Sequence, residues 1–209
     1  DLAKLPTIFM GSEVFATIFP WMKSTFPGFR DEQMKPYTFN PAPFIADKNS
    51  AQQGYATSEP FAVEKAAGWK PKVFLIADAG FNTYSTMIEA KVDYVAANKD
   101  LVQRFVDASI IGWYNYLYGD NTAANEMIKK DNPEMTDEQI AFSIATMKDS
   151  GLLESQEALE SGIGCMTDAR VKDFYDKMAA AGVVKAEIDY KKIYTTEFVC
   201  KKVGMELKK

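Results

Sequence analysis

The chain has 209 residues, of which 47% are hydrophobic and 25% charged, a balance typical of a globular protein with one large domain or two small lobes. Its 24 basic and 29 acidic residues give a net charge of -5 with the signs interspersed, so no nucleic-acid partner is expected. The sequence contains no histidine, which excludes a Ser-His-Asp triad, a Cys-His pair and a histidine-bearing zinc site. We expect neither a metal site nor a cofactor.

The longest apolar stretches, such as residues 73–77 and 110–113, are far shorter than the ~20 residues needed to cross a bilayer. No direct membrane insertion is therefore expected. The chain begins at Asp1 with neither an initiator methionine nor a basic, apolar signal segment, which favours a processed or truncated product.

The first third alternates short strand-like runs with helical ones. Residues 7–10 predict a buried strand, and the turn at residues 11–13 then opens an amphipathic helix that reaches Met22. Residues 37–39 predict a second strand, and residues 44–53 a helical stretch that ends at Gly54.

A third short strand is predicted at residues 55–57, and a fourth at residues 73–77. Between them, Ser58 is placed to cap a helix that has Pro60 in its first turn and ends at Gly68. Strands separated by helices of this length predict a parallel or mixed sheet with helices on its faces, so the fold class is α/β.

After residue 96 the chain is nearly all helix. Asn98 is expected to cap a long helix with a broad apolar face that ends near Gly119. A capping box at residues 136–139 starts another helix, and Thr167 caps a third that runs to Gly182.

Two groups of residues follow predicted strands and are candidate ligand contacts. Gly11 and Ser12 leave backbone N–H groups and the positive end of a helix dipole facing beyond the sheet edge, which favours an anionic or carbonyl group. Taken alone, such a turn is more often ordinary capping. Gln53, Tyr55, Ser58 and Glu59 lie at the end of one strand and the start of the following helix, so we expect them to converge on the same crevice.

A third candidate group is the polar and aromatic loop that contains Phe81, Asn82 and Tyr84. Such a loop can stack on a planar ligand and donate hydrogen bonds to it, although a turn with a half-buried tyrosine explains it equally well. Nothing in the spacing of the nearby carboxylates sets them apart for acid and base work, so the sequence does not support an enzyme.

The two cysteines, Cys165 and Cys200, lie far apart in sequence and lack the spacing of metal ligands. Buried free thiols and a disulfide both remain open, because the sequence does not show whether their Cα atoms come within the ~7 Å that a bridge requires.

Three segments carry a family resemblance: GYATSEPFAVEKAAG (residues 54–68), VFLIADAGFNTYSTMIEA (residues 73–90) and VAANKDLVQRFVDAS (residues 95–109). They resemble the second half of the nitrate/sulfonate/taurine and thiamine-precursor solute-binding proteins of ABC importers. The resemblance implies a type II periplasmic-binding fold, in which residues 1–80 form the second, inserted lobe. Residues 81–209 would then form the hinge return, near residues 81–90, and the helix-rich C-terminal part of the first lobe.

In that family, strand-helix units of the first lobe precede the point that corresponds to Asp1. We therefore expect the N-terminal part of the fold to be missing from this sequence. Ligand contacts from that part cannot be named.

The resemblance implies a monomeric, periplasmic or otherwise extracytoplasmic and membrane-associated protein that hands a small-molecule solute to a membrane permease. Its lobes would close on the ligand without turnover. An oxidising periplasm would also permit a disulfide between the two cysteines. A purely structural or signalling domain is an alternative that binding of a small molecule would exclude.

The identity of the solute is left open. The predicted crevice offers hydroxyl and amide groups but no arginine, which favours a pyrimidine-like heterocycle over a sulfonate, nitrate or taurine-type anion. The resemblance also extends to a pyrimidine-precursor synthase, an enzyme that relies on histidine and a cysteine-rich iron site. The absence of histidine and the two distant cysteines argue against that enzyme.

Overall fold

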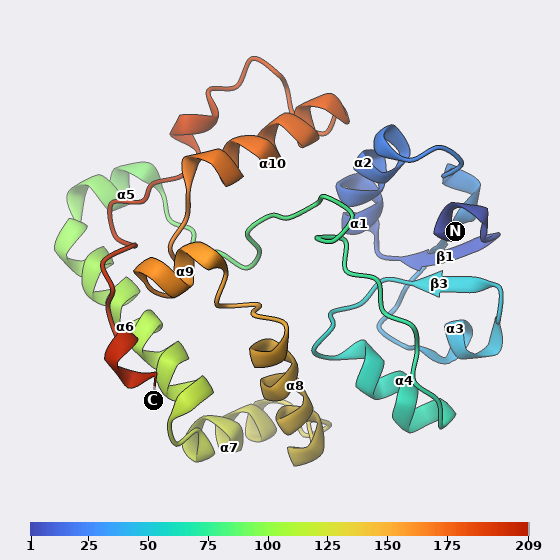
Figure 1. Cartoon of the computed structure of the whole chain (residues 1–209), viewed down its shortest axis with the longest axis horizontal. Helices are drawn as coiled ribbons and strands as arrows, with labels where there is room; N and C mark the ends of the chain where they lie inside the picture. Colours follow the sequence, from blue (N-terminus) through green and yellow to red (C-terminus); the bar gives the residue numbers. More distant parts are fainter. Residues whose placement is uncertain (209) are drawn as a thin grey trace. The chain divides into compact units, whose positions relative to one another are not determined.

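The computed structural model describes residues 1–208, and the chain divides into two compact units (Figure 1). Unit 1 comprises Asp1–Asn82 and Lys172–Tyr190, and unit 2 comprises Thr83–Val171 and the residues from Lys191 onward. Unit 1 therefore contains a segment from the C-terminal third of the sequence in addition to the N-terminal third.

Unit 1 is built around a small parallel sheet. Its strands are β1 (Thr7–Met10), β2 (Met34–Pro36) and β3 (Ser50–Gln52), arranged in the order β2-β1-β3. Both neighbours run parallel to β1, with Ile8 opposite Met34 on one side and Ala51 on the other. The α/β class is confirmed, and every pairing among the described strands is parallel rather than mixed.

The second and third strands lie earlier in the chain than predicted. β2 precedes residues 37–39, and β3 precedes residues 55–57. The helix expected over residues 44–53 is instead the short α3 (Ala42–Ala46). It ends early because the Asn49 N–H donates to Asp47 Oδ1 at 2.9 Å, forming a turn that feeds the chain into β3.

The fourth predicted strand, at residues 73–77, is not formed. The chain is irregular there and closes into a turn in which the Phe81 N–H donates to the Ile76 carbonyl at 3.0 Å. A short apolar run predicts a strand only where a neighbouring strand can pair with it, and none of the described strands does so.

The amphipathic stretch after β1 is divided into α1 (Ser12–Ala16) and α2 (Ile18–Thr25). Pro20 explains the break, because a proline ring in a continuous helix clashes with the carbonyl four residues earlier, here that of Ala16. Pro20 is tolerated in the first turn of the new helix, α2.

The start and end of α4 (Glu59–Ala67) agree with the sequence prediction. Ser58 is the N-cap residue, Pro60 lies in the first turn and Gly68 ends the helix in the left-handed conformation, with φ 74°. The core of unit 1 has two parts. One is centred on Ile8, Met10 and Phe19, and the other on Trp21, Phe81 and Met178.

Within the described residues, unit 2 contains helices and coil but no strand (Figure 1). The long α6 (Lys99–Tyr118) begins after Asn98 and ends at Gly119, as predicted, but the Asn98 side chain does not cap it and donates to the Tyr94 carbonyl instead. One face of α6 supplies most of the core through Val106, Ile110, Tyr114 and Leu117. The other α-helices described in this unit are α5 (Val92–Ala97), α7 (Thr122–Asp131), α8 (Asp137–Asp149), α9 (Gln156–Ser161) and the first part of α10 (Asp168–Ala180), and a short 3-10 helix follows at Met205–Leu207.

Two further predictions in unit 2 have clear outcomes. The Thr136 hydroxyl accepts a hydrogen bond from the Gln139 N–H at 3.2 Å, which confirms the N-terminal cap of α8. Cys165 and Cys200 form a disulfide, which settles the alternative that the sequence left open. None of the helices over residues 1–208 is both long and apolar enough to span a bilayer.

Candidate ligand-binding site

The carboxyl ends of the three parallel strands bring together most of the predicted binding residues of unit 1. β1 leads into Gly11, β2 into Tyr37 and β3 into Gln53. The Gly11 N–H donates to Gln53 Oε1 at 2.6 Å, so this edge is joined by a hydrogen bond between residues 42 positions apart. The sequence predicted that the Gly11 N–H would donate to an anionic or carbonyl group of a ligand. In the structure it donates to the Gln53 side chain instead.

Glu59 is the central group of this edge. Its carboxylate accepts the Tyr55 N–H at 2.7 Å and the Tyr37 hydroxyl at 3.2 Å. A Cβ at Gly54 would lie 2.7 Å from the Glu59 Cβ, so only glycine lets the loop pass this close. Glu59 therefore fastens the loop that follows β3 to the loop that follows β2.

Burial raises the pKa of Tyr37 to about 12, and the adjacent Glu59 carboxylate contributes to the rise by opposing the phenolate charge. Tyr37 consequently stays protonated and remains a hydrogen-bond donor to Glu59 at neutral pH.

Two aromatic side chains near Tyr37 and Glu59 are exposed to solvent. Phe39 is 77% exposed and its ring centroid lies 5.4 Å from that of Tyr37, while Tyr55 is 67% exposed. Phe39 has a positive φ of 62°, an uncommon backbone conformation for a bulky residue. Sequence reasoning missed Phe39 because residues 37–39 were assigned to a strand. The available signal was an aromatic side chain immediately before the turn at Asn40 and Pro41.

Gln52, the last residue of β3, adds an unsatisfied acceptor. Its side-chain oxygen is buried and has no hydrogen-bond partner among the described residues. Leaving a buried acceptor unpaired costs ~1–3 kcal/mol.

The remaining predicted residues of unit 1 are arranged differently. Ser12 and Ser58 occupy the starts of α1 and α4, and neither helix has a side-chain capping bond. Phe81 is buried, with its ring 4.7 Å from Trp21 and 5.8 Å from Phe174, so it belongs to the core. Asn82 is the last residue of this part of unit 1.

Tyr84 belongs to unit 2, where a polar cluster engages both its hydroxyl and its ring. The hydroxyl donates to Glu157 and accepts the Thr167 N–H at 2.9 Å. The Arg170 guanidinium lies 4.3 Å from the ring centroid and contacts Glu157 at 2.8 Å and the Thr83 carbonyl at 3.1 Å. This cluster joins the segment at Thr83 to α9 and α10.

Burial and hydrogen bonds shift the pKa values of Tyr84 and Glu157 in this cluster. Burial and the hydrogen bond to Glu157 raise the pKa of Tyr84. Burial alone would also raise the pKa of Glu157, but hydrogen bonds from Tyr84, from the backbone and from Arg170 lower it to about 2. Glu157 is therefore ionised over the whole physiological range.

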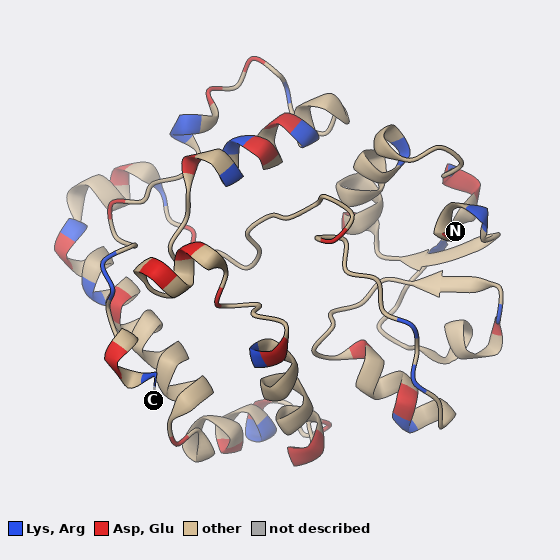
Figure 2. Cartoon of the chain, in the orientation of Figure 1, with Lys and Arg blue, Asp and Glu red and all other residues tan. Residues whose placement is uncertain are grey.

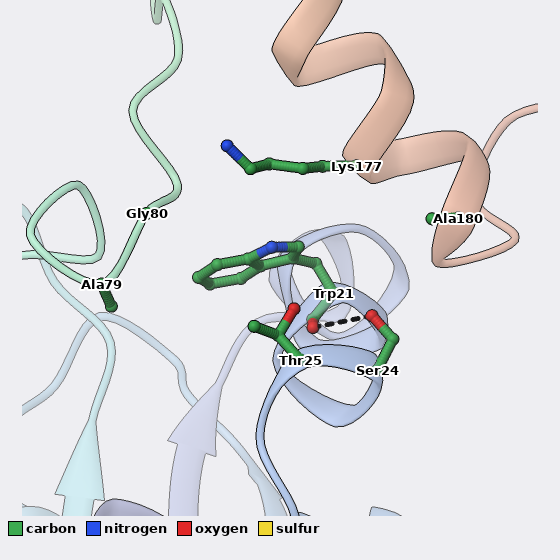
Figure 3. A pocket seen from close by; sticks show the side chains of 7 residues that line it. All are labelled: Trp21, Ser24, Thr25, Ala79, Gly80, Lys177 and Ala180. Carbon is green, nitrogen blue, oxygen red and sulfur yellow. Dashed lines mark hydrogen bonds between the residues drawn. The ribbon is translucent and has the colours of Figure 1, made fainter.

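A hollow of about 360 Å³ opens elsewhere in unit 1, between α2, the turn at Ala79 and Gly80, and the end of α10 (Figure 3). The Lys177 side chain extends above the Trp21 ring in this view, and the Ser24 hydroxyl donates to the Trp21 carbonyl at 2.9 Å. Lys177 is also paired with Asp173. None of the predicted binding residues lines this hollow, so it is separate from the strand ends.

Comparison with known proteins shows a family likeness for part of the chain. Residues 29–124 match the family described as NMT1/THI5 like. This part of the chain is similar to that family. The matched part begins before β2 and ends in α7, so it contains the loops of Tyr37, Phe39, Tyr55 and Glu59. The family resemblance that the sequence indicated is thereby confirmed.

A curated relative extends this likeness over more of the chain. The riboflavin-binding protein RibY of Chloroflexus aurantiacus is 28% identical over 163 residues, which is 76% of this chain and 44% of that protein. The chain therefore spans less than half the length of this relative. None of the solved structures matches it.

Proposed function

We propose that this chain is part of an extracytoplasmic solute-binding protein that captures a flat, nitrogenous heterocycle and delivers it to the permease of an ABC importer. The observation that carries the proposal is the pair of exposed aromatic side chains, Phe39 and Tyr55, at the carboxyl ends of parallel strands. Ligands of open α/β sheets bind beyond this edge of the sheet.

The chemistry of the edge suits a heterocycle. Exposed aromatic rings bind a planar ligand by offset or edge-to-face stacking. The hydroxyls of Ser12 and Ser58 both donate and accept hydrogen bonds. We propose that Gly11 shapes the edge, that Asn82 adds an amide, and that Phe81 and Tyr84 each support the site through the packing of their own unit.

The relative favours the same class of ligand. RibY is named as a riboflavin-binding protein, and riboflavin presents a flat ring system that carries nitrogen donors and acceptors. An aminopyrimidine of the thiamine-precursor type is a smaller flat ring that also carries nitrogen donors and acceptors. A compact anion such as taurine is the weaker candidate, because none of the described residues at these strand ends is an arginine.

Binding without turnover and an extracytoplasmic location belong to the same proposal. The relative is named for binding rather than for a reaction. The disulfide between Cys165 and Cys200 supports an oxidising compartment, where such bonds persist.

The test is calorimetric titration of the purified chain with riboflavin and with an aminopyrimidine, using Phe39→Ala and Tyr55→Ala. We expect one of the two ligands to bind, and each substitution to weaken binding about 2- to 10-fold, the range set by ~0.5–1.5 kcal/mol for an aromatic pair. Phe105→Ala is the matched control, because Phe105 is also exposed but lies on α6 of unit 2.

Unchanged affinity in both variants would contradict the proposed site, and preferential binding of taurine would contradict the ligand class. Conversion of the ligand during the titration, detected by mass spectrometry, would contradict a binding role.

A further inference from the structure

A second surface of unit 1 lies outside the proposed ligand site. Residues 69–76 follow α4 as irregular chain, and we refer to them as the lysine-aromatic segment. Trp69 is 44% exposed and Phe74 is 54% exposed, and Val73 and Ile76 are exposed as well. Four large apolar side chains in eight residues are more than the scattered apolar surface that a protein normally shows.

The charges within this segment have one sign, and the nearest carboxylates are Glu64, beside Lys70, and Asp47, in the hollow lined by Trp69. Lys70 and Lys72 lie within it, and no carboxylate occurs between Glu64 and Asp78. Figure 2 shows basic positions and no acidic position on the coil that rises from α4 toward the next turn. Because the whole chain carries a net charge of -5, this basic surface is opposite in sign to the net charge of the molecule.

The lysines and the aromatic rings are intermixed. Lys72 Nζ lies 4.8 Å from the Phe74 ring centroid, so the charge and the ring occupy the same surface. Lys70 Nζ is 3.8 Å from Glu64, but both side chains are exposed, and such pairs contribute little. Both ammonium groups therefore remain accessible to an anion.

Trp69 is fixed by its neighbours. Its ring centroid lies 5.9 Å from that of Phe44, and the two rings line a hollow of about 360 Å³ that also includes Lys48 and Ser50. Ser50 is the first residue of β3, whereas the proposed ligand site lies beyond its last residue. The lysine-aromatic segment and the ligand site are thus at opposite ends of the same strand.

We propose that the lysine-aromatic segment is the surface by which the protein rests on a membrane that contains anionic lipids. Lysines attract phosphate headgroups, and exposed tryptophan and phenylalanine are the residues that enter the headgroup region. An acidic protein surface fits less well, because lysine is depleted at the centres of protein interfaces. The contact is peripheral, since four apolar side chains are far too few to cross the bilayer.

The test is co-sedimentation of the whole chain with vesicles of phosphatidylcholine, with and without phosphatidylglycerol. We expect binding only to the anionic vesicles, weakening as salt is added. The double variant Lys70→Gln/Lys72→Gln should lower the vesicle partition coefficient about fivefold per lysine, and Phe74→Ala should lower it about tenfold. Trp69 is left unchanged because its loss would disturb the packing on Phe44.

The matched control is Lys35→Gln/Lys91→Gln, which removes the same charge from two other exposed positions. It should leave vesicle binding unchanged, and none of these variants should alter calorimetric titrations with riboflavin. The inference is overturned if the chain fails to sediment with anionic vesicles at low salt, or if the control pair reduces binding as much as Lys70→Gln/Lys72→Gln. Retention on immobilised polyglutamate without vesicle binding would overturn it in favour of an acidic protein partner.

Discussion

At the residue scale, Glu59 shows how a predicted ligand contact acquires a different role. The sequence placed it at a helix start facing a crevice, as a candidate ligand contact. In the structure both carboxylate oxygens already accept bonds from the protein, from Tyr55 and from Tyr37. We propose that Glu59 positions the exposed Tyr55 and acts on the ligand through it.

The substitution Glu59→Gln separates these two roles. Removing the charge should lower the pKa of Tyr37 from about 12 toward its ordinary value of 10.0, although burial will keep it above that value. The free energy of unfolding should fall by about 1 kcal/mol, because charge-assisted hydrogen bonds become neutral ones. NMR titration of labelled tyrosine and urea denaturation measure the two effects.

Glu13→Gln, at an exposed first-turn position of α1, is the control and should change neither quantity. If Glu59→Gln abolishes ligand binding while the pKa of Tyr37 and the stability stay the same, Glu59 contacts the ligand directly.

At the scale of elements, the cluster of Tyr84, Glu157 and Arg170 joins three segments that are separate in sequence. Arg170 contacts the carboxylate, the Tyr84 ring and the Thr83 carbonyl at once. A half-buried carboxylate of this kind stabilises the fold only while it is ionised. The cluster therefore makes the attachment of the segment at Thr83 sensitive to acid.

The direction of the pH effect follows from the pKa of Glu157, which is about 2 in the folded chain against an ordinary value of 4.5. A lowered pKa contributes stability that is fully present above 4.5 and is lost as the pH falls toward 2. Urea denaturation at pH 6, 4.5 and 3 should show this decline, and Glu157→Gln should make it shallower. Glu160→Gln, at an exposed position of the same helix, should keep the wild-type slope. Identical slopes for the wild type and Glu157→Gln would refute the role of the cluster.

At the scale of the whole molecule, the sequence predicted where several helices begin and end, but it did not predict which residues pair in the sheet. The bounds of α4 and α6 were predicted from Ser58 with Gly68 and from Asn98 with Gly119, although among α4, α6 and α8 only Thr136 of α8 makes the predicted side-chain cap. β2 and β3 were misplaced by several residues because register depends on β1, which lies far away in sequence. The site was also hard to predict, because some of its contacts join residues that are far apart in sequence. The strand-end location could be predicted, but the contacts of Glu59 and the exposure of Phe39 depend on how the three loops meet.

The two units also differ in the interactions that stabilise each of them internally. Both units have a hydrophobic core, but unit 1 also has a sheet, whereas unit 2 has the Cys165–Cys200 disulfide. The bond spans a sequence separation of 35 residues and ties the loop before α10 to the C-terminal tail. In that tail, Cys200 has a φ of 62° and Lys202 a φ of 61°, conformations that cost energy in non-glycine residues. The disulfide and the hydrogen bond from the Lys202 N–H to Ser161 offset that cost.

Loss of the disulfide should therefore destabilise unit 2 selectively. Closing a loop of this length contributes about 3–4 kcal/mol, so Cys165→Ala/Cys200→Ala should unfold in two guanidinium transitions, with the helical unit first. Dithiothreitol should produce the same two transitions in the wild type and no further change in the double variant. Tyrosine and tryptophan fluorescence, followed together with far-UV circular dichroism, distinguishes the transitions because Trp21 and Trp69 lie in unit 1 and Trp113 lies in unit 2. Two free thiols on titration of the denatured, unreduced protein, or a single transition that reductant does not shift, would show that the bond does not hold unit 2 together.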